Sequence, residues 1–187
     1  MAAIKRKCFI SYHHADQDEV NRFIRTFDHG LDCFTARGLG EEMSQDIIDS
    51  MDTDYVMGRI RALYLKGSSV TLVMLGQNTW SRRYVDWELQ SSLRRGETIT
   101  PNGLLGVRLP SYSPAHGYPD RLNMNLLTRE QQAAGKSCYA SVIDYPTSEQ
   151  ELVSAIEAAN SRRLSHAHLI VNPRERYKYN KSTERFI

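Results

Sequence analysis

Tyr84 and Glu88 are the residues whose types and spacing most suggest chemistry. They lie four positions apart in a segment with helical periodicity, so both side chains share one face about one turn apart. The segment follows residues 70–76, an apolar run typical of a buried strand. An aromatic ring one turn before a carboxylate, at the end of a central strand, could hold and cleave a nucleotide.

Segments with strand and helix patterns alternate along the 187 residues. The run at 70–76 is apolar on both faces, which is typical of a central parallel strand. Asp16 has the chemistry of a helix cap, and Asp52 or Asp54 could cap a later helix. The patterns predict strands over residues 8–10, 31–36, 69–76, 104–109 and 139–143. They predict helices over residues 16–28, 44–51, 54–66, 82–95 and 147–163.

This alternation predicts an α/β domain of the flavodoxin-like class, with three layers and helices on both faces of a parallel sheet. Right-handed crossovers and five strands favour the strand order 2-1-3-4-5. In that order the first and third strands are neighbours, and ligands bind beyond their carboxyl ends. Residues 11–14, which follow the first strand, should therefore face the helix that carries Tyr84 and Glu88.

Length and composition fit a single domain, which we assign to residues 1–165. Residues 166–187 lack periodicity and are interpreted as a mobile C-terminal extension. The net charge of +2 gives no electrostatic case for nucleic acid. The three cysteines form no disulfide framework. No apolar run approaches the ~20 residues of a membrane span or forms a signal peptide, so we expect a cytoplasmic protein.

Several chemistries common in α/β proteins lack their required residues here. A phosphate receiver needs acidic residues after the first strand and an aspartate after the third, where this chain has Ser-Tyr-His-His and Gly-Gln-Asn. Gly135-Lys-Ser resembles the end of a phosphate-binding loop, but position 130 is glutamate instead of glycine. His166 and His168 have no third ligand nearby, so no metal site is predicted. The acidic residues between 41 and 54 are interpreted as a solvated face.

Two stretches resemble a known family. Phe9-Ile-Ser-Tyr-His-His-Ala-Asp resembles the first box of TIR domains. Residues 68–89, which include Asn-Thr-Trp-Ser-Arg-Arg-Tyr-Val-Asp-Trp-Glu-Leu, resemble the third strand and following helix of TIR-like proteins of the Thoeris bacterial anti-phage system. Gly96 and Leu104-Leu-Gly-Val continue that pattern. Residues 7–108 carry the resemblance, and the last third of the chain follows it by the order of its elements.

The resemblance implies an enzyme that cleaves NAD, with NAD as substrate and no cofactor. In enzymatic TIR domains the glutamate of this helix is catalytic, and that position is Glu88. The aromatic residue four positions earlier often stacks against the substrate, and that position is Tyr84. The loop after the first strand borders the site. The expected substrate-binding residues there are Ser11, Tyr12, His13 and His14.

The resemblance also implies a product and partners. Relatives release nicotinamide and convert ADP-ribose into a cyclic isomer or an amino-acid conjugate, and we expect a cyclic signal that activates a separate effector. The loop at 37–43 is expected to gate the site or contact a neighbouring subunit, with self-association on activation. This loop lacks the Arg-Asp-Pro-Gly signature of many receptor TIR domains, which argues against receptor-style signalling. Neither nucleic acid nor a membrane is an expected partner.

The chemistry is consistent with these residue types. The bond between nicotinamide and ribose breaks through an oxocarbenium-like transition state, comparable to that of glycoside hydrolysis. A carboxylate on the ribose hydroxyls stabilises the developing positive charge. Nicotinamide leaves as a neutral base, so no strong general acid is required.

Alternatives remain for the residues and for the function. Glu88 also fits a solvated helix position, and Tyr84 fits simple packing. His13 and His14 fit capping or surface roles as well as acid–base roles, and Trp87 is interpreted as a structural anchor. The alternative functions are a non-catalytic TIR scaffold that acts by assembly, and an enzyme like the nucleoside deoxyribosyltransferases, which share the fold and a catalytic glutamate.

Overall fold

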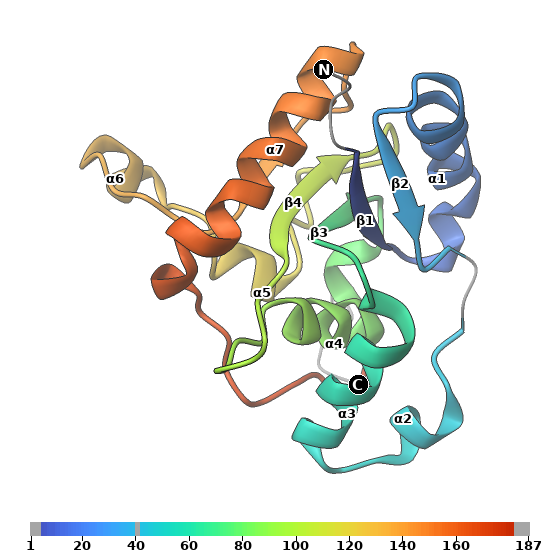
Figure 1. Cartoon of the computed structure of the whole chain (residues 1–187), viewed down its shortest axis with the longest axis vertical. Helices are drawn as coiled ribbons and strands as arrows, with labels where there is room; N and C mark the ends of the chain where they lie inside the picture. The colour runs from blue at the N-terminus through green and yellow to red at the C-terminus, as the bar shows by residue number, and fades with distance from the viewer. Residues whose placement is uncertain (1–4, 40–41, 182–187) are drawn as a thin grey trace.

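The computed structural model describes residues 5–39 and 42–181, which form a five-stranded parallel sheet with the order β2-β1-β3-β4-β5 (Figure 1). This is the predicted flavodoxin-like order, and the prediction is confirmed. The strands are β1 Arg6–Ser11, β2 Phe34–Arg37, β3 Val70–Leu75, β4 Gly103–Arg108 and β5 Ser141–Ile143.

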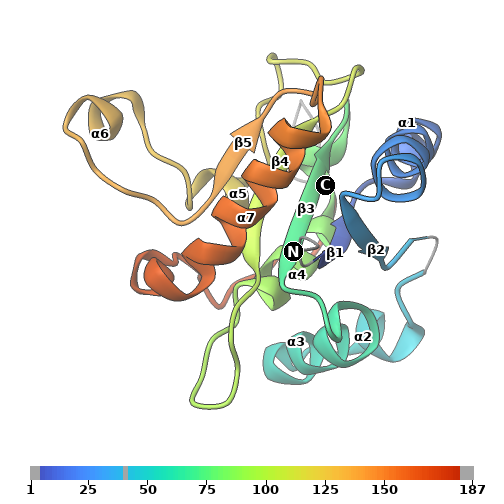
Figure 2. The ribbon, with the colours of Figure 1, turned by 45° about the horizontal axis from the view of Figure 1, so that its top comes forward.

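Helices follow each of the first four strands and close the domain. They are α1 Gln17–Ile24, α2 Gln45–Asp49, α3 Thr53–Ile60, α4 Arg83–Ser92, α5 Asp120–Asn123, α6 Arg129–Ala133 and α7 Glu149–Ser165. Wider π-helical turns, Arg25–Gly30 and Arg61–Leu65, extend α1 and α3. Figure 2 shows α6 on an arm that extends away from the sheet, and none of its residues is buried.

Both faces of the sheet are covered. On one face α1 and α7 pack against the strands, with Phe23 and Ile156 buried. On the opposite face α3, α4 and α5 pack, with Ile60, Leu89 and Leu122 buried (Figure 1). Each such side chain contributes roughly 1.5–3 kcal/mol through burial. These two layers therefore fix the position of α4 relative to the strands.

The strands at the centre of the sheet pack closely against their neighbouring strands and helices. All six residues of β3 are buried, because the strand has a neighbour on each side and helices on each face. Gly103 opens β4 directly beneath α7, and a Cβ atom there would overlap the backbone carbonyl of Ala159. A side chain at position 103 would therefore have to push α7 away from the sheet.

The start of the second strand and the role of Asp16 differ from the sequence predictions, whereas the predicted cap at Asp52 is confirmed. The second strand begins at Phe34 rather than at 31, because the turn after α1 continues through Gly30 and Asp32 adopts a left-handed conformation with φ 58°. Asp16 does not cap α1; its buried carboxylate accepts a hydrogen bond from Thr79 Oγ1 at 3.2 Å. Asp52 caps α3 by accepting from the backbone N–H groups of the next turn.

The C-terminal extension lies against the domain as far as the structure describes it. Trp87 Nε1 on α4 donates to Tyr177 O at 2.8 Å, and Gln90 Nε2 donates to Pro173 O at 3.0 Å. The Lys181 N–H donates to Ser81 O at 2.8 Å. Residues 166–181 therefore contact the domain, residues 182–187 lie outside the described part of the chain, and the mobility of the extension stays a prediction. Trp87 is a structural anchor, as interpreted from the sequence.

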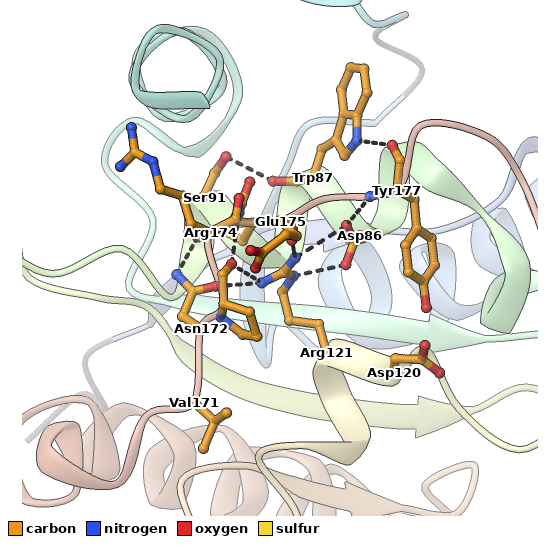
Figure 3. A network of polar contacts seen from close by, with 12 residues as sticks. Asp86, Trp87, Ser91, Asp120, Arg121, Val171, Asn172, Arg174, Glu175 and Tyr177 are labelled. Atoms are coloured by element: carbon orange, nitrogen blue, oxygen red, sulfur yellow. Dashed lines mark hydrogen bonds and ion pairs between the residues drawn. The ribbon is translucent and has the colours of Figure 1, made fainter. Parts of the chain in front are cut away.

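A buried ion pair holds this extension in place (Figure 3). Arg121 Nε on α5 donates to Asp86 Oδ1 on α4 at 2.8 Å, and the two side chains are 4% and 2% exposed. The remaining guanidinium N–H groups donate to the extension, including Asn172 Oδ1 at 2.8 Å and Glu175 O at 2.7 Å. Asp86 Oδ2 in turn accepts from the Tyr177 N–H at 3.0 Å. The pair thus joins α4, α5 and the extension.

The contact at Gly103 predicts a position-specific loss of stability. Gly103→Ala should lower the free energy of unfolding by about 1–3 kcal/mol, because the new methyl group must displace α7. The matched control is Gly58→Ala on α3, where the nearest heavy atom is 3.5 Å away. That change should stabilise the protein by up to about 1 kcal/mol through helix propensity. Urea unfolding checks both, and equal effects of the two changes would contradict the packing account.

Loss of the buried cation should release the extension. Arg121→Met leaves the Asp86 carboxylate buried without its counter-ion, which should cost about 3–5 kcal/mol in urea unfolding. Amide exchange at Tyr177 should become faster, because its acceptor is no longer fixed. The control is Arg129→Met at an exposed arginine of α6, which should leave both measurements unchanged. A slow Tyr177 amide in Arg121→Met would refute the clamp.

Candidate functional site

A cavity of about 560 Å³ lies at the carboxyl ends of β1 and β2, beside the first turns of α4. Its wall is formed by the end of β1, the loops after β1 and β2, parts of α1, α2 and α4, and the C-terminal extension. The lining residues are Ile10, Tyr12, His13, His14, Gln17, Gly38, Glu42, Met43, Ile48, Arg82, Arg83, Tyr84, Val85, Glu88 and Asn180. The cavity therefore occupies the edge where ligands bind in open α/β sheets.

Glu88 reaches the cavity from the second turn of α4. Ser11 Oγ, at the end of β1, donates a hydrogen bond to Glu88 Oε2 at 2.6 Å. Burial of the carboxyl raises the pKa of Glu88 to about 8, although the Ser11 hydrogen bond works in the opposite direction. Glu88 as a residue is half-buried and lines the cavity, so a ligand can reach it. Without a ligand it is mostly protonated at neutral pH.

Tyr84 lies one turn before Glu88 and also lines the cavity. The Arg83 guanidinium stacks over the Tyr84 ring at 4.7 Å, and Arg83 Nη2 donates to the Tyr84 hydroxyl at 2.8 Å. Trp87 packs edge-on at 5.4 Å between ring centroids. The Tyr84 ring is thus held by Arg83 and Trp87 in the wall of the cavity.

The loop after β1 forms another part of the wall. The His13 and His14 rings meet edge-on with centroids 4.2 Å apart, and the Tyr12 hydroxyl donates to Gln17 Oε1 at 2.5 Å. His13 is 8% exposed, and burial lowers its pKa to about 4, with a smaller contribution from the positive charge of Arg82. His13 is therefore neutral at physiological pH.

The structure brings the candidate site residues of the sequence analysis together. Five of the six line the cavity, and Ser11 lies behind the wall with its hydroxyl on Glu88. From the predicted loop at 37–43, Gly38, Glu42 and Met43 also line the cavity. Residues 40 and 41 lie outside the described part of the chain. The gating role of this loop stays a prediction.

Sequence reasoning missed Arg82, Arg83 and Asn180. The paired arginines gave a signal, because cations at the start of a helix oppose the helix dipole and need a reason to be there. Asn180 gave none. Its Oδ1 accepts from the Arg83 N–H at 3.0 Å and thus caps α4, since Arg82 offers no side-chain acceptor at the cap position.

The site can supply a carboxyl group, an aromatic face and cationic side chains. Within residues 5–39 and 42–181, no group of three or more His, Cys, Asp or Glu side chains is placed to hold a metal ion. In the same ranges no helix combines the length and apolarity that crossing a membrane requires. The arrangement suits a ligand with a flat ring, a polyhydroxylated ring and a negative charge.

The strand order and the position of the cavity define a flavodoxin-like α/β domain, built as TIR domains are. Residues 9–113 match the family described as Thoeris protein ThsB, TIR-like domain, and the chain belongs to this family. The chain is thus a TIR-type module of a defence system, as the sequence resemblance indicated. No curated protein matches the sequence. The family match ends before α5 and the C-terminal extension, although both pack on α4.

The raised pKa of Glu88 predicts a pH-dependent stability difference. Between pH 4.5 and 8 the folded carboxyl holds its proton while the unfolded one has lost it, so stability falls as pH rises. Glu88→Gln removes this titration. The variant should become more stable than the wild type by on the order of 1–5 kcal/mol at pH 8, and by much less at pH 4.5.

Urea unfolding at a series of pH values measures this difference. The matched control is Glu130→Gln on the exposed arm, where hydrogen bonds lower the carboxyl pKa, so this variant should not gain stability over the wild type as pH rises. The difference in free energy of unfolding between the wild type and Glu88→Gln should change with pH. A constant difference across this range would show that the pKa of Glu88 is the same in the folded and the unfolded protein.

Proposed function

We propose that this chain cleaves NAD between nicotinamide and ribose, with Glu88 as the residue that binds the ribose and stabilises the transition state. The observation that carries the proposal is the Glu88 carboxyl, held by Ser11 at 2.6 Å and open to a cavity that Tyr84 also lines. Membership of the Thoeris TIR-like family supports it independently.

The reaction needs little from the protein besides placement and charge. The electron pair of the C1′–N bond leaves with nicotinamide and neutralises the positive pyridinium ring, so no proton donor is required. The ribosyl carbon then takes an oxygen from water, which loses a proton to solvent, or a nucleophilic atom of the same ADP-ribose. The first route gives ADP-ribose, and the second gives a cyclic product.

Glu88 has the electrostatic properties for this task. Before substrate binds, its carboxyl is mostly protonated at neutral pH, because burial raises its pKa to about 8. The positive pyridinium of NAD favours the charged carboxylate, so the substrate promotes the ionised form. As the bond breaks, positive charge moves from the pyridinium to the ribose, where the carboxylate accepts the hydroxyl hydrogen bonds. Stabilisation is then greatest in the transition state.

Tyr84 and the β1 loop complete the arrangement. Tyr84 would stack on the nicotinamide ring from its position in the cavity wall. Neutral His13 would accept or donate a hydrogen bond without adding charge. By family, the ADP-ribose product is a signal, expected to be cyclic, that activates a separate effector encoded alongside. The chain would then act through that signal rather than by assembly alone.

The direct test is nicotinamide release from NAD in phage-exposed cells that express the wild type or Glu88→Gln. The variant keeps an acceptor for Ser11 but loses the charge, and it should release nicotinamide at least about 100-fold more slowly. For the wild type, kcat/KM should rise with pH and level off above about 8, because the ionised carboxylate is the active form. Mass spectrometry identifies the product.

The control is Gln150→Glu, a charge change at an exposed position of α7 away from the cavity. It should release nicotinamide at the wild-type rate. Equal release by wild type and Glu88→Gln would remove Glu88 from the mechanism. If Glu88→Gln protected cells fully while changes at 37–43 abolished protection, the assembly alternative would replace the proposed one.

A further inference from the structure

Arg82 is a cationic side chain in the cavity wall with an unused donor. Its Nε atom is buried and has no hydrogen-bond partner among the described residues. No ion pair joins its guanidinium to a carboxylate in that part of the chain. Arg83 differs, because its guanidinium donates to the Tyr84 hydroxyl and to Lys178 O. Arg83 therefore supports the wall, while Arg82 is available to a ligand.

Holding Arg82 in this place is costly for the protein alone. A buried donor without a partner destabilises the folded protein, and a cation at a helix N-terminus opposes the dipole of α4. An anionic ligand would offset both terms. Its oxygens would accept from the guanidinium in charge-assisted hydrogen bonds, which are stronger than neutral ones.

The groups around Arg82 do not neutralise it. His13 beside it is neutral, and Glu88 is mostly protonated at neutral pH before substrate binds. The Asp16 carboxyl is close enough for Arg82 to affect its titration, but it is buried and bonded to Thr79 Oγ1. Glu42 lines the cavity from an exposed position on the loop after β2. The positive charge of Arg82 is thus directed to the cavity without an ion-pair partner.

We propose that Arg82 binds the diphosphate of the dinucleotide, an inference that rests on the proposed function. Arg82 immediately precedes the first turn of α4, Glu88 lies in its second turn, and both line the cavity. In a ribofuranoside the two ring hydroxyls project from one face, and the base and the 5′-phosphate arm project from the other. With the hydroxyls at Glu88, both arms extend toward the start of α4, the base to Tyr84 and the diphosphate to Arg82.

This arrangement assigns separate tasks along one helix. Glu88 recognises the ribose, Tyr84 the flat ring, and Arg82 the charge that distinguishes a dinucleotide from a nucleoside. The chemical class selected is therefore a nucleotide with a 5′-phosphate or diphosphate, and nicotinamide riboside should be a poor substrate. Arg82 affects binding of the substrate rather than the bond that breaks.

The test compares Arg82→Gln, Arg82→Lys and the control Arg25→Gln, which removes an exposed arginine after α1. Calorimetry measures binding of ADP-ribose, which keeps the diphosphate but lacks the bond between nicotinamide and ribose that the enzyme would cleave. Lysates of phage-exposed cells provide KM values for NAD and for nicotinamide riboside, with a Glu88→Gln lysate as the background.

Arg82→Gln should bind ADP-ribose about 10- to 100-fold more weakly and raise the KM for NAD similarly, with nicotinamide riboside cleavage unchanged. Arg82→Lys should recover part of the loss, and Arg25→Gln should match the wild type. Equal ADP-ribose binding by the wild type and Arg82→Gln would overturn the assignment. A wild type that cleaves NAD while Arg82→Gln shows no KM change overturns this inference alone. A wild type that neither binds ADP-ribose nor releases nicotinamide overturns the proposed function as well.

Discussion

The buried ion pair between Asp86 and Arg121 is the interaction on which the candidate site depends. Two fully desolvated charges are stable only when each is paired and its remaining hydrogen-bonding capacity is used. Here the Arg121 guanidinium donates its further hydrogen bonds to the C-terminal extension. The Asp86 carboxylate accepts hydrogen bonds from Arg121 and from the Tyr177 N–H. The electrostatic requirement of one pair thus orders a segment that has no core of its own.

The helix α4 contacts the sheet, the C-terminal extension and the cavity, each with a different face. Val85 and Leu89 pack on the sheet, Asp86 and Gln90 hold the extension, and Glu88 lines the cavity with Tyr84. A helix fixed on two faces can present the third with little freedom, which is what an electrostatic site requires. The same enclosure removes water from the Glu88 carboxyl and raises its pKa.

Much of the fold followed from periodicity, because a strand buried on both faces and amphipathic helices leave strong patterns. The sheet order followed from the crossover rule. The polar contacts of Asp16 and Arg121 did not follow. Asp16 has the sequence context of a helix cap, but its carboxylate bonds to Thr79, 63 positions away. A rule based on neighbouring residues cannot predict when a side chain bonds to a residue far away in the sequence.

The sequence by itself determined the class of the domain and the adjacency of residues 11–14 to Glu88, because strand pattern and topology are encoded locally. It also carried the family resemblance, from which the proposed substrate comes. Tertiary structure alone decided the ionisation of Glu88, the place of Arg82 and the docking of the extension. Each depends on desolvation or on contacts between distant segments. Burial and long-range hydrogen bonding are properties of the packed chain, and no spacing of residues records them.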